Sequence, residues 1–336
     1  MDASRTTRSV TATLDRMQVA TSAVIGERAS KALFLLAAVS VIAMLLFIVV
    51  VLVQHSIAFF GYEHVTLTEF LTSTHWEPID QDDLGWGIWP LLTATLLIAF
   101  GATLIGLPIG LATAIYLAEY AHPRVRATLK PTLELLAGIP SIVFGFFAIQ
   151  AISPIWVDLT TPGATLYEFT GGAFYDLNGG PARVFNAMNA IVVVGIMVIP
   201  IIASLSEDAI RSVPRHLREA SLGVGATKWE TTRKVVLPAA ISGITASVVL
   251  AVARAIGETM AVTLAAGTQA NFVLNPFESV LTMTAYIAQT FGTEQPLVGA
   301  TFDSMFAVGL ALFTMTLILN LVAQRFVKKF REVETQ

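Results

Sequence analysis

Six long apolar segments constrain this chain more than any other feature of its sequence. A helix needs roughly 20 mainly apolar residues to cross about 30 Å of hydrocarbon, and every segment has that length. Continuous apolar runs favour helices, because the strands of a membrane barrel are short and alternating. The sequence therefore predicts an all-α polytopic membrane protein with six transmembrane helices. Their approximate bounds are Ala32–Val53, Trp89–Leu117, Leu133–Trp156, Ala187–Ser206, Ala239–Ala266 and Leu297–Ala323.

The composition agrees with a membrane protein. Of the 336 residues, 55 % are hydrophobic and only 13 % are charged, a balance far from that of a soluble globular domain. The absence of cysteine excludes disulfides and thiolate chemistry. The first apolar run lacks a small-residue cleavage site before the acidic loop that follows it. We therefore interpret it as a transmembrane helix and not as a signal peptide.

Basic residues are concentrated in every second connecting segment, and this distribution predicts the topology. Residues 54–88 and 267–296 contain no Lys or Arg, and residues 157–186 contain only Arg183. Because basic residues near membrane ends stay in the cytoplasm, both termini are predicted to be cytoplasmic. The basic clusters are Arg5 to Lys31, Arg124 to Lys130, Arg211 to Lys234 and Arg325 to Arg331.

The segments give an organisation along the chain. Residues 1–31 are predicted to be a disordered or loosely helical cytoplasmic arm. In the acidic extracytoplasmic loop, Trp76, Trp86 and Trp89 fit interfacial anchors. The glycine-rich residues 157–186 could touch a docking partner. The predicted divisions are the arm 1–31, a first transmembrane helix 32–53, the acidic loop 54–88, a five-helix core 89–323 that includes a polar loop 211–238, and a cytoplasmic tail 324–336.

The polar loop predicts a helix, a tight turn and a second helix. Pro214 suits the first turn of a helix, and the small residues 220–225 suit a turn in which glycine takes a positive φ. Thr227–Val236 is predicted to resume as a helix that stops before Pro238. Such a compact projection is suited to fill a cleft on another protein, whereas the simpler alternative is a basic loop that only obeys topology.

Arg254 is the one basic residue inside an apolar segment. An Arg near the centre of a spanning helix costs about 2.5–3.5 kcal/mol on insertion scales. Glu258 lies four residues further on, so both could share a helix face. The pair could be purely structural, or Arg254 could pair with a neighbouring subunit. Alternatively, the guanidinium could bind two oxygens of an anion, with Glu258 holding Arg254 in the empty state and competing with the anion when it arrives.

Hydroxyl side chains could share the remaining oxygens of such an anion. The candidates are Thr259, Thr263, Ser141 and Thr95, although hydroxyls in membrane helices usually bond to their own backbone. Gly138 to Ser141 reads either as a packing site or as a broken helix that lines a pathway. The five histidines have no i,i+4 partner, which argues against a metal site.

Two stretches resemble known families. Glu219 to Pro238 resembles the cytoplasmic "EAA" loop of binding-protein-dependent ABC importers, through which a membrane subunit grips its ATPase. Ala253 to Ala261, which reads ARAIGETMA, is similar to the signature of phosphate-specific transport (Pst) permeases, and within them to the PstC branch. The positions that match the EAA loop are Glu219, Ala220, Ser221, Gly223, Gly225, Leu237 and Pro238.

The resemblance implies the type I ABC importer permease fold and a set of partners. These are a homologous PstA-like permease, a PstB-like ATPase dimer, a PstS-like phosphate-binding protein and the lipid bilayer, without nucleic acid. It also implies that the essential channel pair falls on Arg254 and Glu258. No cofactor is expected in this chain, because the GxxxxGK[ST] phosphate loop is missing, so ATP and Mg would be bound by the partner ATPase.

The expected function is therefore that of an inner-membrane transport subunit for inorganic phosphate and not of an enzyme. A permease for another oxyanion, such as molybdate, sulfate or phosphonate, remains an alternative. A secondary anion transporter would leave the EAA-like loop unexplained. A membrane-embedded phospholipid enzyme should carry a His or acidic cluster at one interface, and the sequence shows none.

Overall fold

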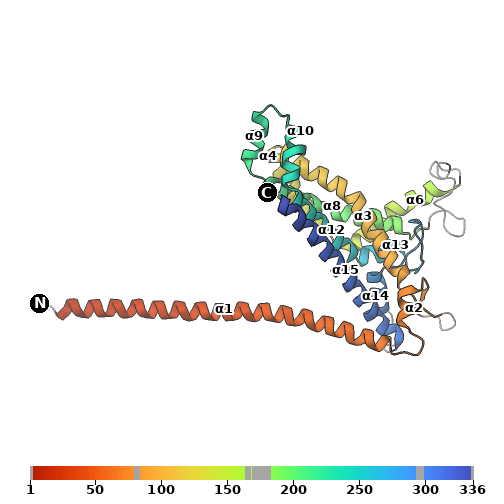
Figure 1. Cartoon of the computed structure of the whole chain (residues 1–336), viewed down its shortest axis with the longest axis horizontal. Helices are drawn as coiled ribbons and strands as arrows, with labels where there is room; N and C mark the ends of the chain where they lie inside the picture. Colours follow the sequence, from red (N-terminus) through yellow and green to blue (C-terminus); the bar gives the residue numbers. More distant parts are fainter. Residues whose placement is uncertain (1–2, 79–83, 163–167, 169–182, 293–298, 334–336) are drawn as a thin grey trace. The chain divides into compact units, whose positions relative to one another are not determined.

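The computed structural model describes residues 3–78, 84–162, 168, 183–292 and 299–333 (Figure 1). The chain divides into two compact units, Met1–Gln54 and His55–Gln336. Helix α1 (Ala3–Phe59) forms the first unit and the start of the second. It runs through both the predicted arm, from Ala3 onward, and the predicted first transmembrane helix. The stretch has no proline and only Gly26 as a glycine, so no residue interrupts its hydrogen-bond ladder.

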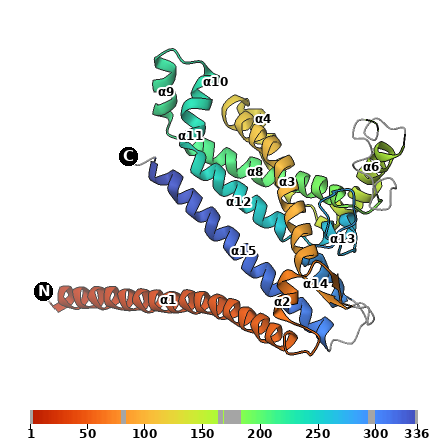
Figure 2. The ribbon, with the colours of Figure 1, turned by 45° about the vertical axis from the view of Figure 1, so that its right-hand side comes forward.

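The second unit is built from helices with one short hairpin (Figure 2). The long helices are α3 (Trp89–Ile115), α8 (Ala187–Ser212), α12 (Ile241–Ile256) and α15 (Ala300–Val333). The shorter elements are α2 (Leu67–Thr72), β1 (Trp76–Glu77), β2 (Gly85–Trp86), η1 (Tyr116–Tyr120), α4 (Pro123–Ala137), α5 (Ser141–Phe147), η2 (Ala148–Ile152), α6 (Ser153–Thr160), α9 (Arg215–Gly223), α10 (Lys228–Thr231), η3 (Thr232–Val236), α11 (Leu237–Ala239), α13 (Met260–Ala266) and α14 (Met283–Gly292). The elements η1, η2 and η3 are single π-helical turns.

Among the described residues, five helical segments are long and apolar enough to cross a membrane, and a bent pair could add a sixth. The pair consists of Lys228–Ala239 and Ile241–Ile256, which meet at 70°. The prediction of six spans is met when this pair counts as one. The five unbent segments are Ser30–Phe59, Trp89–Tyr120, Ser141–Thr160, Ala187–Ser212 and Ala300–Arg325.

Two predicted spans have the wrong bounds. The third was expected over Leu133–Trp156, but the helix stops at Ala137 and resumes at Ser141. The interruption lies before Pro140, because the residue that precedes a proline, here Ile139, avoids the helical region. The fifth was expected to reach Ala266. Instead α12 ends at Ile256, and α13 begins after a short break. The last helix also continues through most of the predicted tail, as far as Val333.

Helices α3 and α8 form the most extensive contact between described elements. Glycines let their backbones approach closely, as small residues do in membrane helix pairs. A Cβ on Gly106 would lie 2.5 Å from Val198 Cγ2 and 2.9 Å from the carbonyl oxygen of Gly195. A Cβ on Gly110 would lie 2.8 Å from Ile202 Cβ. Gly106, Gly110 and Gly195 therefore form a close-packed line between the two helices, which we call the glycine seam.

Residues 55–78 and 84–88 form an aromatic cap, and the tryptophan prediction is wrong for two of the three residues. Trp76 and Trp86 are only 3 % and 2 % exposed, since they stack edge to face across the β1–β2 hairpin. Trp76 also packs on Tyr286, with ring centroids 5.0 Å apart. Only Trp89 is exposed, and its indole N–H donates to the Leu71 carbonyl at 2.7 Å. Burial in a shared aromatic core has outweighed the preference of tryptophan for the interface.

Asp303, whose role the sequence did not reveal, joins this cap to α15. Its carboxylate lies 2.9 Å from His55 Nδ1 and accepts a hydrogen bond from the Tyr62 hydroxyl at 3.0 Å. The hydrogen bond to Asp303, helped by desolvation, raises the pKa of Tyr62. The His55 ring stacks on Phe306, with centroids 4.3 Å apart. Asp303 therefore fixes residues 55–62 to the beginning of α15.

The glycine seam gives a first prediction. Gly106→Leu should lower the apparent melting temperature of the purified chain, because the new side chain has no space against Val198 and Gly195, and overpacking costs about 1–3 kcal/mol. Differential scanning fluorimetry in detergent measures the shift. Gly292→Ala is the matched control, since no atom lies within 4 Å of the added Cβ. An unchanged melting temperature for Gly106→Leu would mean that the seam does not limit stability.

Candidate functional site

The predicted helix–turn–helix is present in the polar loop, and we call residues 214–238 the knob. Helix α9 follows Pro214, the chain turns, and α10 begins after Thr227. Gly225 takes φ 88°, as the predicted turn requires. Thr227 and Glu230 form a reciprocal capping box, and the backbone hydrogen bond from Thr227 lowers the pKa of the Glu230 carboxyl. The side chains of Ser221 and Thr231 hydrogen-bond at 2.9 Å and tie the two helices together.

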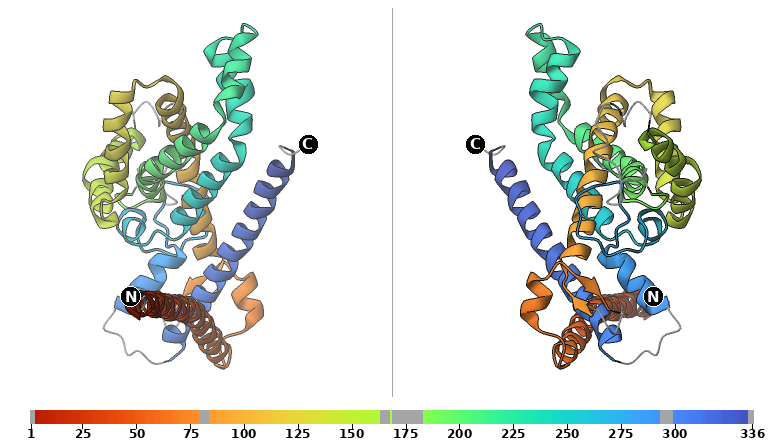
Figure 3. Two further views of the ribbon diagram at one scale, coloured as in Figure 1. Left: turned by 90° about the vertical axis from the view of Figure 1, so that its left-hand side faces the viewer. Right: turned by 90° about the vertical axis from the view of Figure 1, so that its right-hand side faces the viewer.

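The end of the knob projects beyond the neighbouring helices (Figure 3). Three large apolar side chains are exposed there: Leu222, Val224 and Trp229, with Val224 87 % exposed. This apolar tip was missed by the sequence reasoning, which followed the family motif. Exposed apolar groups gathered on a projection are typical of a surface that another protein covers.

The motif residues divide into two groups. Glu219, Ala220, Gly223, Gly225 and Pro238 are exposed, whereas Ser221 and Leu237 are half-buried inside the knob. The second helix was predicted to stop before Pro238, which is wrong. The π-helical turn η3 shifts the hydrogen bonding before Pro238, and the helix continues through α11 to Ala239.

The base of the knob is fixed to two long helices. Arg218 Nη2 donates to Glu119 Oε1 at 3.0 Å and to the Ile210 carbonyl at 2.7 Å. Glu119 belongs to η1, at the end of α3, and Ile210 belongs to the last turns of α8. The ammonium group of Lys228 also lies over the Tyr120 ring, 4.8 Å from its centroid. A displacement of the knob would therefore act on both α3 and α8.

A buried carboxylate near the same end of α8 forms ion pairs with three basic side chains. Glu207 is 0 % exposed, and its oxygens lie 2.7 Å from Arg126 Nε, 2.8 Å from Lys130 Nζ and 3.6 Å from Arg211 Nε. Burial tends to lower the pKa of Lys130, but its bonds to Asp208 and Glu207 outweigh burial and raise it. This network holds α4 against α8.

Arg254 lies in the last turn of α12 and is exposed. Among the residues that the structure describes, it makes no hydrogen bond and no ion pair. Ala246, Leu250 and Gly257 are exposed with it and fall on one stripe along the helix, whereas Ala251 and Ala255 on the adjacent side are buried. A charged side chain on an unpartnered stripe of a spanning element is the expected position of a residue that meets a partner subunit or a pathway.

The proposed pair of Arg254 and Glu258 is not formed in this structure. The helix breaks between them at Gly257, so they do not share one helix face. Glu258 is 7 % exposed, and its Oε1 accepts from the backbone N–H of Ala261 at 3.3 Å, in the first turn of α13. Its own carbonyl accepts from Thr284 Oγ1 at 2.8 Å. In this state Glu258 stabilises the break and leaves Arg254 open.

The candidate hydroxyls occupy different environments. Thr95 is buried; it donates to Leu91 O at 2.7 Å and accepts from Met283 N at 3.1 Å, so it joins α3 to α14. Thr259 Oγ1 bonds weakly to Gly257 O at 3.3 Å beside the break. Ser141 begins α5 after the Gly138–Pro140 break and is half-buried. The fourth candidate, Thr263, donates to Thr259 O at 2.8 Å. Thr259 is the candidate nearest to Arg254 in the chain, and the roles of all four in binding stay predictions.

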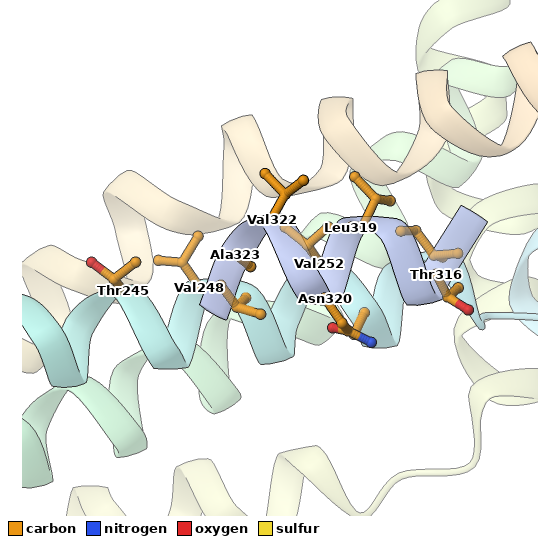
Figure 4. Close-up of a pocket in the computed structure, with 11 residues that line it drawn as sticks. Thr245, Val248, Val252, Thr316, Leu319, Asn320, Val322 and Ala323 are labelled. Atoms are coloured by element: carbon orange, nitrogen blue, oxygen red, sulfur yellow. The ribbon is translucent and has the colours of Figure 1, made fainter. Parts of the chain in front are cut away.

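A groove of about 260 Å³ lies between α12 and α15 (Figure 4). Val248, Val252 and Leu319 are among its apolar lining residues, and its polar lining residues are Thr245, Thr316 and Asn320. Thr316 already donates to Phe313 O. The groove is on a different side of α12 from Arg254 and contains no charged residue, so it is unsuited to an anion. Within the described ranges, no group of three His, Asp or Glu side chains is placed to hold a metal ion.

Comparisons with known proteins agree with this geometry. Residues 106–332 match the family model described as binding-protein-dependent transport system inner membrane component. The chain is 32 % identical over 269 residues to the probable ABC transporter permease protein YqgH of Bacillus subtilis, covering 80 % of each chain. It is 35 % identical over 259 residues to the phosphate transport system permease protein PstC of Mesorhizobium japonicum, covering 76 % of each.

A relative in Mycobacterium tuberculosis, the phosphate transport system permease protein PstC 2, is 30 % identical over 305 residues, 89 % of this chain and 91 % of its own length. Among solved structures, a chain of a bacterial ABC transporter involved in the import of the acidic polysaccharide alginate has a TM-score of 0.58 at 16 % identity. The match covers 88 % of this chain and 95 % of that one. At this identity the likeness concerns the fold, which is that of an ABC importer permease.

The base of the knob gives a second prediction. Arg218→Gln should increase hydrogen exchange at the backbone amides of α9 several-fold, because the knob loses its bond to Glu119 and weakens its bond to the end of α8. Exchange followed by mass spectrometry measures this change. Arg215→Gln, an exposed residue on the same helix, is the control and should leave exchange unchanged. Equal protection in both variants would refute the anchoring role of Arg218.

Proposed function

Since the chain belongs to the binding-protein-dependent transport system inner membrane components, we propose that it is the permease subunit of an ATP-driven importer of inorganic phosphate. The observation that supports the transport role most directly is the open guanidinium of Arg254 in a spanning helix. A guanidinium offers a planar fork of donors to two oxygens of an anion. Leaving this charge without a partner in the membrane is costly, so a negative group from outside this chain fits the site.

The phosphate assignment is supported by the relatives and by the residues around the break. Two curated relatives are phosphate transport system permease proteins, and the segment from Arg254 to Ala261 has the sequence that resembles the Pst signature. Glu258 repels a second negative charge near the break, which keeps the affinity low and favours release. Thr259 and Ser141 are proposed to share the remaining oxygens of the anion, and Thr95 to hold the neighbouring backbone.

The knob supports coupling to a separate ATPase. Its exposed apolar tip is proposed to enter a cleft on the ATPase, while Arg218 and Lys228 pass the movement of that contact to the ends of α3 and α8. The proposed partners are a PstA-like permease that faces the Arg254 stripe, a PstB-like ATPase dimer that binds ATP and Mg, and a PstS-like binding protein. With this arrangement the knob and both termini are on the cytoplasmic side of the inner membrane.

In the proposed cycle, ATP binding closes the ATPase dimer, moves the knob and tilts α3 and α8 so that the pathway opens outward. Phosphate released by the binding protein then meets Arg254, and reopening of the dimer lets it leave inward. Another oxyanion could bind to Arg254 in the same way, so only a measurement of uptake distinguishes phosphate from sulfate or molybdate. A secondary transporter is disfavoured, because the exposed tip of the knob would have no function there.

The substrate and the site are tested together by uptake. Proteoliposomes that contain this chain with its co-purifying subunits should accumulate radiolabelled phosphate when ATP is supplied, and a large excess of sulfate should not compete. Arg254→Gln should reduce the uptake rate at least 100-fold, since a charge-assisted contact of about 1.5–3 kcal/mol and the attraction of the whole cation are lost. Arg124→Gln, an exposed residue on α4, should transport normally.

Each other result has a definite meaning. Uptake that survives Arg254→Gln would make Arg254 a structural residue. Uptake of sulfate or molybdate in place of phosphate, with the ATPase bound and active, would preserve the importer and replace the substrate. Transport without any ATPase subunit would favour the secondary transporter.

Coupling is tested separately at the tip of the knob. Val224→Asp should reduce ATP-driven uptake and the amount of ATPase that co-purifies, each by about tenfold or more, because a carboxylate would be buried without a partner in the contact. His216→Gln, exposed on α9 away from the tip, is the control. Full co-purification and uptake in Val224→Asp would show that the ATPase does not cover the tip.

A further inference from the structure

A pocket of about 300 Å³ lies at the N-terminal end of α8 and is separate from Arg254. It is formed where the chain enters α8, leaves α13 and returns toward α14. Arg183, Thr268, Gln269 and Ser279 give it a polar wall. The other lining residues are Val184, Phe185, Thr263, Leu264 and Gly267. Unlike the groove between α12 and α15, this pocket is lined by a positively charged side chain, that of Arg183.

The polar wall is rich in hydrogen-bond donors. Arg183 Nη1 donates to Gln269 Oε1 at 3.0 Å. This bond uses the oxygen of the Gln269 amide and not its NH₂ group. In the described part of the chain, no hydrogen bond occupies the hydroxyls of Thr268 or Ser279. The Ser279 hydroxyl is notable because the residue is only 6 % exposed. Because Ser279 lines the pocket, its hydroxyl is placed to donate to a ligand oxygen there.

The backbone of the pocket depends on Gly267. This residue takes φ 98°, in the left-handed region that glycine adopts without strain. A Cβ there would lie 2.1 Å from Ser279 Oγ and 3.2 Å from Phe185 Cβ. Only glycine therefore lets the segment after α13 lie against Ser279. The close approach brings Thr268 and Gln269 to the same pocket as the Ser279 hydroxyl.

The charge of the pocket favours a weakly held anion. Arg183 is the only Lys or Arg in the three segments 54–88, 157–186 and 267–296. Its Nε lies 3.7 Å from Oε2 of Glu278, which is fully buried behind the pocket wall. The carboxylate orients the guanidinium and offsets part of its charge. An anion would still meet the donors of Thr268, Gln269 and Ser279, but with an affinity low enough for rapid exchange.

The position of the pocket connects it to the proposed pathway. Helix α8 has 26 residues and is therefore about 39 Å long, with the pocket before its first residue and the knob after its last. The pocket is thus at the end of the second unit opposite the knob. Thr263 lines the pocket and donates to Thr259 O at 2.8 Å, one turn from the break that follows Arg254. Helix α13 therefore connects the pocket that contains Arg183 with the break that follows Arg254.

We propose that this pocket is a second, low-affinity binding site for a small oxyanion, held by Arg183, Thr268, Gln269 and Ser279. The inference rests on the proposed function, and it identifies where phosphate first binds to this chain before it reaches Arg254. Thr263 and Thr259 lie along the route between the two sites. The site is built from donors on three separate segments, which allows a tetrahedral ion to be bound from several sides.

The test measures binding without transport. Inorganic phosphate is titrated into nanodiscs that contain this chain with its co-purified subunits, without ATP and without binding protein, and broadening of the phosphate ³¹P resonance reports exchange. In an Arg254→Gln background the broadening should persist. Adding Arg183→Gln should raise the dissociation constant at least tenfold, and Thr268→Val should raise it several-fold. Arg183→Lys, which retains the charge, should bind more tightly than Arg183→Gln.

The variants separate a binding role from a structural one. Thr268→Val leaves the contacts of Arg183 with Gln269 and Glu278 intact, so its effect cannot be attributed to loss of folding. Broadening that is unchanged in both Arg183→Gln and Thr268→Val would overturn the inference while leaving the uptake result untouched. Conversely, broadening that depends on Arg183 in a transporter that does not take up phosphate would support the anion site and remove phosphate as the substrate. Broadening lost with Arg254→Gln alone would also overturn the inference.

Discussion

The close approach of α3 and α8 is the constraint on which the rest of the second unit depends. A lipid environment supplies no hydrophobic force between helices, so packing of small residues has to hold them together. Gly106, Gly110 and Gly195 allow this contact. At one end of α8 the contact supports the knob through Arg218, and at the other it positions the pocket that contains Arg183. The packed helices α3 and α8 thus hold the apolar tip of the knob and the polar pocket of Arg183 apart by the length of α8.

Much of this organisation could be predicted from the sequence, because the governing signals are local. The number of spans follows from the length of apolar runs, and the helix–turn–helix of the knob follows from Pro214 and Gly225. The unusual position of Arg254 follows from the cost of a cation among apolar neighbours. In each case the residues that carry the signal are adjacent in the chain, and the physical cost they imply is large.

The remaining features depend on contacts between distant residues, which no local pattern reveals. Trp76 and Trp86 looked like interfacial anchors because their burial depends on distant partners, which are Tyr286 for Trp76 and Phe59 for Trp86. Glu258 looked like a partner of Arg254, since an apolar run gives no sign of where its helix ends. The apolar tip around Val224 could have been noticed as a hydrophobic residue inside a polar loop, but only its exposure in the fold gives it meaning.

The position of Arg254 at the end of α12 has an electrostatic consequence of its own. The carbonyl groups in the last turn of a helix carry the negative end of its macrodipole, equivalent to about half an elementary charge. Arg254 lies in that turn, so its cation is partly balanced by the backbone that holds it. An approaching anion therefore experiences a field that is strong at the guanidinium and weak a few ångströms away. Such a short-ranged attraction can guide an ion through a narrow point without trapping it there.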